Sequence, residues 1–332
     1  MEYEGGIIYF FKKEISKYLG LMEDIVEGIF YLLSGSEKKG YSKYSFIYKD
    51  LIRENLLVQR RVCRVGIAQI GLSNSDDFLK QYYQSWASGL LWLRKEKVKI
   101  IRSKMMNMIE SAHKSNINLL LFPELAIDLN FSELIEDVSN LATKYKMYIV
   151  PGSFHDRLTR RNLSLVFGPE GGILWEQEKL TPAYIRIKKE QFKEKIKVSL
   201  PRKVIVCNTE YGRIAILICR DFLDMDLRVG LKNFEPPVDI ILNPSFTPFT
   251  ADFHAAHVDA RRSIYAYCCF ANIGQFGNSQ IYCPEKERVK NIIPSKKEGL
   301  ILKDIDLFKL RSERKKWEVE KTKDNNFIQS TK

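Results

Sequence analysis

The stretch INLLLFPELAID, residues 117–128, contains the short apolar run LLLF, which is followed by a proline and an acidic residue, Glu124. A run of this kind, with no polar residue inside it, is typical of a strand buried on both faces of its sheet. Comparable runs recur along the chain, over residues 62–70, 147–153, 163–167, 204–207, 213–219, 238–243, 266–273 and 279–283. Because helical patterns separate several of these runs, the sequence predicts an α/β fold.

The clearest helical pattern covers residues 94–115. Its apolar positions recur every three or four residues and therefore fall on one face of a helix. They are Val98, Ile101, Met105, Ile109 and Ala112. Further helices are expected over 131–146, 222–233 and 251–265.

The two ends of the chain differ from this core. Apolar residues within 7–33 recur at roughly helical spacing, and we expect a second helix over 44–58. Residues 309–332 hold eight Lys or Arg against four Asp or Glu, as a charged tail would. The sequence therefore predicts a helical N-terminal extension over 1–60, a main domain over 61–308, and a charged tail over 309–332.

The chain of 332 residues carries a net charge of +12, with 45% apolar and 28% charged residues. This composition is ordinary for a globular protein and excludes a wholly disordered chain. Its basic stretches are 157–161, 188–197 and 311–316. They lack the aromatic residues that interleave with basic ones in an RNA-binding strand, so we do not expect specific nucleic-acid binding.

The six cysteines form neither a CxxC pair nor a metal-type spacing with histidine, so we expect reduced thiols and no metal site. The N-terminus has its acidic and basic residues in the wrong order for a secretory signal. The longest uncharged stretch, 263–284, contains too many polar residues to be a good membrane span. These features predict a cytoplasmic protein with no membrane contact.

Three polar residues stand where a strand is expected to end: Glu124 follows LLLFP, Lys179 follows ILWEQE, and Cys219 ends RIAILI. Strand ends are where functional sites collect in α/β folds. Each residue alone has an ordinary explanation, a solvated rim position for the charged pair and a core position for the cysteine. Together they form a chemical set, because a carboxylate can deprotonate a thiol and an ammonium can stabilise the oxyanion that the thiolate produces.

These residues stand in motifs that resemble those of the nitrilase superfamily of carbon–nitrogen hydrolases. LLLFPELAID, EQEKLTPA and GRIAILICRDF resemble its glutamate, lysine and cysteine motifs. The flanking strands resemble it as well, through VGIAQIG, IILNPSF, RRSIYAYCCFANIGQFGNSQIYCP and GLILKDIDL. The resemblance covers about residues 61–306 and keeps the order of the motifs.

The resemblance implies a four-layer α-β-β-α sandwich, a homodimer or higher homo-oligomer, and hydrolysis of a small-molecule amide, N-carbamoyl compound or nitrile without metal or organic cofactor. In the implied mechanism, Glu124 takes the proton of Cys219, and Lys179 and the backbone N–H of Arg220 stabilise the oxyanion. Asp221 completes a Cys-x-Asp pattern seen in amidase-like members, which favours amide or carbamoyl substrates. By analogy, Asn243, Ser245 and Phe246 would line the pocket.

Four points of this interpretation leave alternatives open. A second glutamate often supports the lysine in this family, and of the candidates Glu190 and Glu194 we favour Glu190, although both could lie on a solvated helix. Residues 72–92 resemble an insertion whose aromatic side chains could fill the core or cover the pocket. Arg220 could select an anionic substrate or pair with a surface acid. A catalytically silent or ligand-sensing module on the same fold is the alternative to an enzyme.

Overall fold

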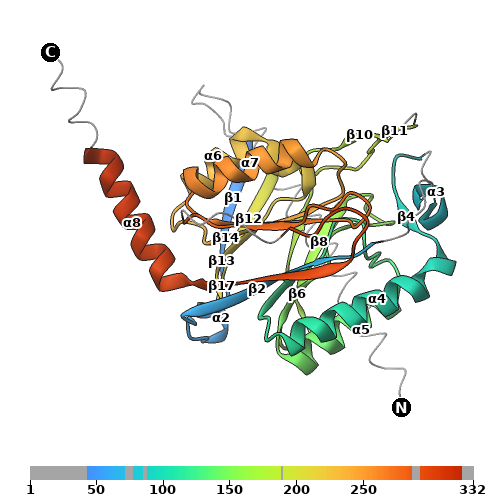
Figure 1. The fold of residues 1–332 in the computed structure, drawn as a ribbon, viewed down its shortest axis with the longest axis horizontal. Helices are drawn as coiled ribbons and strands as arrows, with labels where there is room; N and C mark the ends of the chain where they lie inside the picture. The colour runs from blue at the N-terminus through green and yellow to red at the C-terminus, as the bar shows by residue number, and fades with distance from the viewer. Residues whose placement is uncertain (1–42, 72–77, 85–87, 188–189, 286–291, 324–332) are drawn as a thin grey trace.

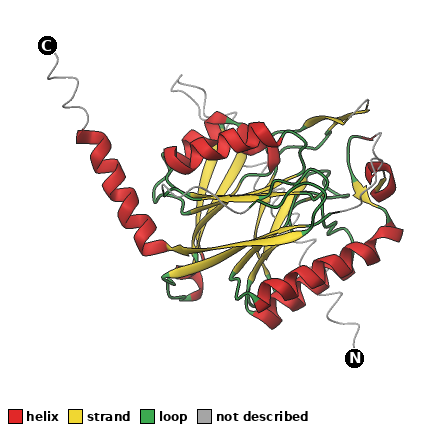
Figure 2. Ribbon diagram, viewed as in Figure 1, coloured by secondary structure: helices red, strands yellow, loops and turns green. Residues whose placement is uncertain are grey.

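A computed structural model of the chain describes residues 43–71, 78–84, 88–187, 190–285 and 292–323. Two β-sheets pack face to face, and helices lie on the outer side of each sheet (Figure 1). Figure 2 shows the strands in the middle of the molecule and the helices outside them. The helix predicted over 7–33 lies outside the described residues.

Within the described residues, the first sheet has the strand order β1-β12-β13-β14-β15-β16. Its strands are β1 (Tyr44–Asp50), β12 (Arg202–Thr209), β13 (Gly212–Ile216), β14 (Ile240–Ser245), β15 (Tyr267–Asn272) and β16 (Gln280–Tyr282). The second sheet has the order β17-β2-β5-β6-β8-β7, with β9 paired to β8. Its strands are β17 (Gly299–Asp306), β2 (Val62–Gln69), β5 (Leu119–Leu121), β6 (Tyr148–Val150), β8 (Asn162–Phe167), β7 (Phe154–His155) and β9 (Ile173–Glu178).

Helices close both outer faces of the sandwich. Figure 1 shows α4 (Lys95–Lys114) and α5 (Ser132–Tyr145) on one side, and α6 (Met225–Lys232) and α7 (Thr250–Ser263) on the other. α4, α5 and α6 lie within their predicted ranges and α7 begins one residue before its range, and the five apolar residues predicted on one face of α4 are buried. Within the described part of the chain, no helix has both the length and the apolar character of a membrane span.

The position of strand β5 explains why its sequence is apolar throughout. Leu119 and Leu121 belong to the core between the two sheets, whereas Leu120 belongs to the core beneath α4 and α5. Successive side chains of a strand point to opposite faces, so a strand covered on both faces needs apolar residues at every position. Packing on both faces therefore fixes the end of β5. Glu124 follows shortly after this end.

The helix predicted over 44–58 is wrong for most of its length. Residues 44–50 form β1, which pairs in parallel with β12 at the edge of the first sheet, and only α2 (Leu51–Asn55) is helical. Aromatic residues suit a half-buried strand surface, and Tyr44 is buried there whereas Tyr48 remains exposed. Residues 44–50 thus belong to the same sheet as the cysteine motif rather than to a separate helical extension.

The beginning of the predicted tail is anchored to the sandwich. Helix α8 (Leu307–Lys323) places Arg311 and Arg314 against the fully buried carboxylate of Asp239, and Arg213 contacts it as well. Burial by itself would raise the pKa of Asp239, but the arginines hold it below its usual value of 3.8. The Asp239 carboxylate therefore provides the counter-charge for three guanidinium groups in a largely buried site.

Replacing Asp239 with asparagine is expected to lower the free energy of unfolding by about 3–5 kcal/mol, because the arginines lose their buried counter-charge. Urea unfolding measures the change. The matched control is Asp259→Asn. Asp259 pairs with Arg228 at 2.8 Å but its side chain is 58% exposed, so its loss should change stability by about 1 kcal/mol or less. Equal effects of the two variants would contradict the assigned role of Asp239.

Candidate active site

The structure brings together two of the three residues of the predicted set in a direct ion pair and places the third beside them. Glu124 lies just beyond β5, Lys179 directly follows β9, and Cys219 begins the 3-10 helix η2 (Cys219–Leu223) after β13. The Nζ of Lys179 is 2.7 Å from the Oε1 of Glu124. All three residues are buried. Because β13 belongs to one sheet and β5 and β9 to the other, the site forms only when the two sheets pack.

Cys219 occupies a sharp turn. Its φ of 46° lies in the left-handed region, which is unfavourable for a residue with a side chain and often marks functional sites. Asn243 stabilises this turn, because its Nδ2 donates to the carbonyls of Leu217 at 2.5 Å and of Cys219 at 3.2 Å. Ser245 in turn donates to the Oδ1 of Asn243.

This geometry corrects the role expected for two residues of the strand after the cysteine. Asn243 and Ser245 do not line the pocket; they are fully buried behind the turn and fix its backbone. Only Phe246 of the three predicted residues lines the cavity. The physical reason is that β14 is covered on both faces, so its polar side chains satisfy neighbouring backbone groups instead of a ligand.

The ammonium of Lys179 lies between two carboxylates. Its Nζ is 2.8 Å from the Oε2 of Glu194, in addition to its contact with Glu124. Burial by itself would lower the pKa of Lys179, but the charges of the two carboxylates outweigh burial and hold it well above 10.5. Lys179 is therefore a fixed positive charge, able to stabilise an oxyanion but not to act as a base near neutral pH.

The second carboxylate is Glu194 and not the favoured candidate, Glu190. Residues that could have formed a solvated helix instead form a hairpin of β10 (Tyr184–Ile187) and β11 (Glu190–Lys193), and Glu194 directly follows it. The Oε2 of Glu194 also accepts the backbone N–H of Ala183 at 2.6 Å. Burial by itself would raise the pKa of Glu194, but Lys179 and a hydrogen bond from His155 hold it below its usual value of 4.5.

The surroundings of Cys219 favour the protonated thiol over the thiolate. Burial, followed by the charge of Glu124, raises its pKa well above 9, whereas Lys179 and the N–H of Phe246 act in the opposite direction. Of the charged groups around the thiol, Glu124 has the strongest effect on its pKa. The arrangement suits a nucleophile that loses its proton to the adjacent carboxylate during the reaction, rather than one stored as a thiolate.

Asp221 supports the residue after the lysine. Its carboxylate accepts the N–H of Leu180 at 3.0 Å and thereby ties the lysine segment to η2. Burial raises the pKa of Asp221 to about 7, although hydrogen bonds from Leu180 and Thr181 act against that rise. Arg220, in contrast, has an exposed side chain whose Nη1 donates to the carbonyl of Pro182 at 3.2 Å.

Two buried polar residues of this site escaped the sequence reasoning. Asn162 opens β8, and its Nδ2 bridges the carboxylates, at 2.9 Å from the Oε1 of Glu124 and 3.0 Å from the Oε1 of Glu194. His155 is its cross-strand neighbour in β7 and contacts Glu194 at 2.8 Å. Their sequence signal was weak: each is a single polar residue at the edge of an apolar run.

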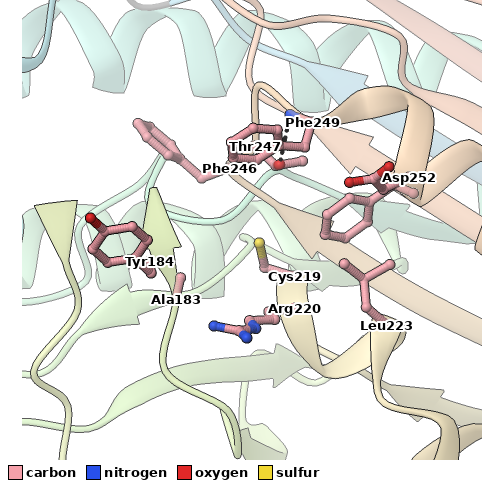
Figure 3. A pocket seen from close by; sticks show the side chains of 10 residues that line it. Ala183, Tyr184, Cys219, Arg220, Leu223, Phe246, Thr247, Phe249 and Asp252 are labelled. Carbon is pink, nitrogen blue, oxygen red and sulfur yellow. Dashed lines mark hydrogen bonds between the residues drawn. The ribbon is translucent and has the colours of Figure 1, made fainter. Parts of the chain in front are cut away.

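A cavity of about 210 Å³ opens above the cysteine. Figure 3 shows the thiol of Cys219 directed into it, with Phe246 and Phe249 on one side and Arg220 on the other. Its lining is mostly apolar and consists of Ala183, Tyr184, Cys219, Arg220, Leu223, Phe246, Thr247, Phe249, Asp252 and Phe253. Substrate atoms that fill the cavity would therefore lie within reach of the sulfur.

Three of the four aromatic residues of the predicted insertion that the structure describes lie in the interior, and the fourth, Trp92, is half-buried. Phe78, Tyr82 and Tyr83 are buried, and the rings of Phe78 and Tyr83 each lie 6.1 Å from the ring of Phe246. The segment includes α3 (Phe78–Tyr82) and the short hairpin of β3 (Tyr83–Gln84) and β4 (Trp92–Leu93). These residues support the cavity wall from behind, whereas Trp86 lies outside the described residues.

Comparisons with known proteins agree with the geometry. The family model described as carbon–nitrogen hydrolase matches residues 89–315. An arylacetone-specific nitrilase of Alcaligenes faecalis is 26% identical over 167 residues, which are 42% of this chain and 45% of that protein. The match thus spans less than half of the curated relative.

Solved structures share the fold at lower sequence identity. The NitFhit protein of C. elegans superimposes with a TM-score of 0.61 at 18% identity, over 80% of this chain and 65% of that chain. An amidase from Nesterenkonia sp. has a TM-score of 0.53 at 14% identity, over 75% of this chain and 93% of that one. The family match covers well over half of the sequence, including all three motifs, and the chain therefore belongs to the carbon–nitrogen hydrolases of the nitrilase superfamily.

Proposed function

We propose that this protein hydrolyses a small amide or N-carbamoyl compound through a thioester on Cys219. The observation that carries the proposal is the buried ion pair of Glu124 and Lys179 next to Cys219, whose side chain lines a cavity. An uncompensated buried charge is strongly unfavourable, so two carboxylates and an ammonium next to a thiol favour a catalytic set over a chance cluster.

The proposed reaction begins when Glu124 takes the proton of Cys219 and the sulfur attacks the substrate carbonyl carbon. Lys179 and the backbone N–H of Arg220 stabilise the oxyanion that forms. When the tetrahedral intermediate collapses, Glu124 returns the proton to the leaving nitrogen, which departs as ammonia or an amine. Glu124 then deprotonates a water molecule that attacks the thioester, and the carboxylic acid leaves as the thiol regains its proton.

One feature of the sequence favours amide or carbamoyl substrates over nitriles. Asp221 completes the Cys-x-Asp pattern and holds the segment that follows Lys179. A variant of the Nesterenkonia amidase, with a TM-score of 0.52 at 14% identity, carries the acetamide moiety of fluoroacetamide covalently on its active-site cysteine. That adduct is a property of the amidase, and it supplies a probe for the cysteine of this chain.

The cavity favours a small, uncharged acyl group. Its wall is largely aromatic and aliphatic, and its charged side chains, Arg220 and Asp252, have opposite signs and are both exposed. An acidic substrate would therefore meet Asp252 as well as Arg220, and the pair together gives no net preference for an anion. The presence of Asp252 beside Arg220 in the cavity lining therefore argues against selection of an anionic substrate by Arg220.

The test is a panel of acetamide, propionamide, benzamide, N-methylurea and propionitrile, assayed by ammonia release. We expect turnover of an uncharged amide or carbamoyl compound, and addition of the acetamide moiety of fluoroacetamide to Cys219 by intact-mass and peptide analysis. Turnover of the nitrile alone would overturn the amide assignment. A folded protein that neither releases ammonia nor forms the adduct would favour the silent or ligand-sensing alternative.

A further inference from the structure

His155 is a completely buried histidine whose two ring nitrogens both have partners. The backbone N–H of Leu91 donates to Nδ1 at 2.7 Å, and Nε2 lies 2.8 Å from the Oε1 of Glu194. A backbone N–H can only donate, so Nδ1 carries no proton. The proton is therefore on Nε2, and a neutral imidazole donates it to the carboxylate of Glu194.

Glu194 depends on this donor for its orientation. Its Oε2 accepts from Lys179 and from the N–H of Ala183, whereas its Oε1 accepts from His155 and Asn162. Asn162 divides its Nδ2 between Glu194 and Glu124. Among the described contacts of Oε1, His155 is thus the side-chain donor that is not shared with Glu124. Without His155, the amide of Asn162, which also donates to Glu124, would be the remaining side-chain donor to that oxygen.

The segment Ser88–Leu93 packs against the backbone on both sides of Glu194. The N–H of Lys195 donates to the carbonyl of Gly89 at 2.8 Å. Gly89 has a φ of +77°, and a Cβ there would lie 2.7 Å from the carbonyl oxygen of Lys193. Only glycine fits this approach. The next contact along the segment is the hydrogen bond from Leu91 to His155.

The far end of the same segment is also tied to the surroundings of His155. The Nε1 of Trp92 donates to the carbonyl of His155 at 3.1 Å, and the N–H of Leu93 donates to Asp128 at 2.8 Å. The Ser88–Leu93 segment therefore contacts His155 at the ring and at the backbone. Its position and the orientation of Glu194 are linked through one imidazole.

We infer that His155 is a positioning residue of the reaction, which couples the Ser88–Leu93 segment to Glu194 and, through it, to the ammonium of Lys179. The inference rests on the proposed function and adds to it a residue that touches none of the reacting atoms. Another buried histidine, His257, contrasts with it: its Nδ1 donates to the carbonyl of Phe253, as a residue of purely structural role would.

Two substitutions of His155 separate positioning from general packing. His155→Leu fills the space but removes both hydrogen bonds. His155→Gln retains one acceptor and one donor on a single amide group, so it can replace both contacts. We expect His155→Leu to lower kcat by roughly 10²-fold with KM changed by about twofold or less, because Lys179 loses its position. We expect His155→Gln to recover most of that loss.

A third variant tests the segment itself. Gly89→Ala introduces strain and a clash with the backbone beside Glu194 while leaving His155 intact, and it should also lower kcat, by roughly tenfold or more. His113→Gln, on the outer helix α4, is the control and should match the wild type. Circular dichroism and urea unfolding show whether each variant is folded, so Gly89→Ala decides the question if His155→Leu does not fold.

The rate at which iodoacetamide alkylates Cys219 provides a readout that needs no substrate. If the panel above finds no turnover, the proposed function fails, but the inference still predicts about tenfold slower alkylation in folded His155→Leu and recovery in His155→Gln. Wild-type kcat and alkylation in folded His155→Leu would overturn it. Equal losses in the leucine and glutamine variants, in proportion to their lost stability, would also overturn it.

Discussion

Replacing Cys219 with alanine is expected to reduce ammonia release from any accepted amide by on the order of 10⁴-fold or more, because no other group can form the thioester. Cys219 is the cysteine that lines the cavity, and the other five are buried elsewhere in the fold. Binding should survive, since the aromatic wall is unchanged. Ammonia release gives the activity, and equilibrium dialysis of the unreacted amide gives the affinity.

The control for this prediction is Cys283→Ala. Cys283 is a buried cysteine that follows β16 and does not line the cavity. It should retain wild-type turnover, and fluoroacetamide should still add to Cys219. Substantial hydrolysis by folded Cys219→Ala would refute the proposed mechanism, whichever substrate is found.

The sequence was sufficient for the parts of the fold that local pattern determines. The triple leucine of β5 required burial on both faces, and the apolar stripe of α4 required one covered face; both are found. Residues 44–50 were misassigned because their pattern also fits a helix. Their partner strand, β12, lies 158 residues away in the sequence (Tyr44 pairs with Arg202), and pairing at that separation leaves no local signal.

The same contrast between local patterns and long-range strand pairing explains which residues of the candidate site could be predicted. Glu124, Lys179 and Cys219 each follow a recognisable strand, so their neighbourhood could be predicted. The choice between Glu190 and Glu194 depends on how the hairpin of β10 and β11 is registered, and a shift of one residue moves a side chain to the opposite face. His155 and Asn162 are adjacent only through strand pairing, which the sequence alone does not specify.

The predicted homodimer, the cytoplasmic location and the absence of specific nucleic-acid binding remain predictions. The net charge of +12 has no visible part in the catalytic arrangement, where Lys179 is outnumbered by the carboxylates of Glu124 and Glu194. Among the described residues, some of the basic excess is instead structural, since three arginines surround Asp239. Basicity therefore cannot be taken as evidence of a polyanionic partner.

Replacing Glu124 with glutamine is expected to lower kcat by roughly 10²–10⁴-fold, because the amide cannot accept the thiol proton. Glutamine has nearly the shape of glutamate and keeps an oxygen for Lys179. The buried ammonium also retains Glu194 at 2.8 Å as a counter-charge. The variant should therefore stay folded, and its alkylation by iodoacetamide should slow together with its turnover.

Glu194→Gln is the matched comparison, since both carboxylates contact Lys179 but, of the two, Glu124 is the one whose charge raises the pKa of the Cys219 thiol. It should lose less activity, roughly 10–10²-fold, through displacement of the ammonium rather than loss of the base. Iodoacetamide should still label Cys219 in Glu194→Gln faster than in Glu124→Gln. Equal labelling rates in the two folded variants would show that Glu124 is not the base, and would leave both carboxylates with the same task of neutralising Lys179.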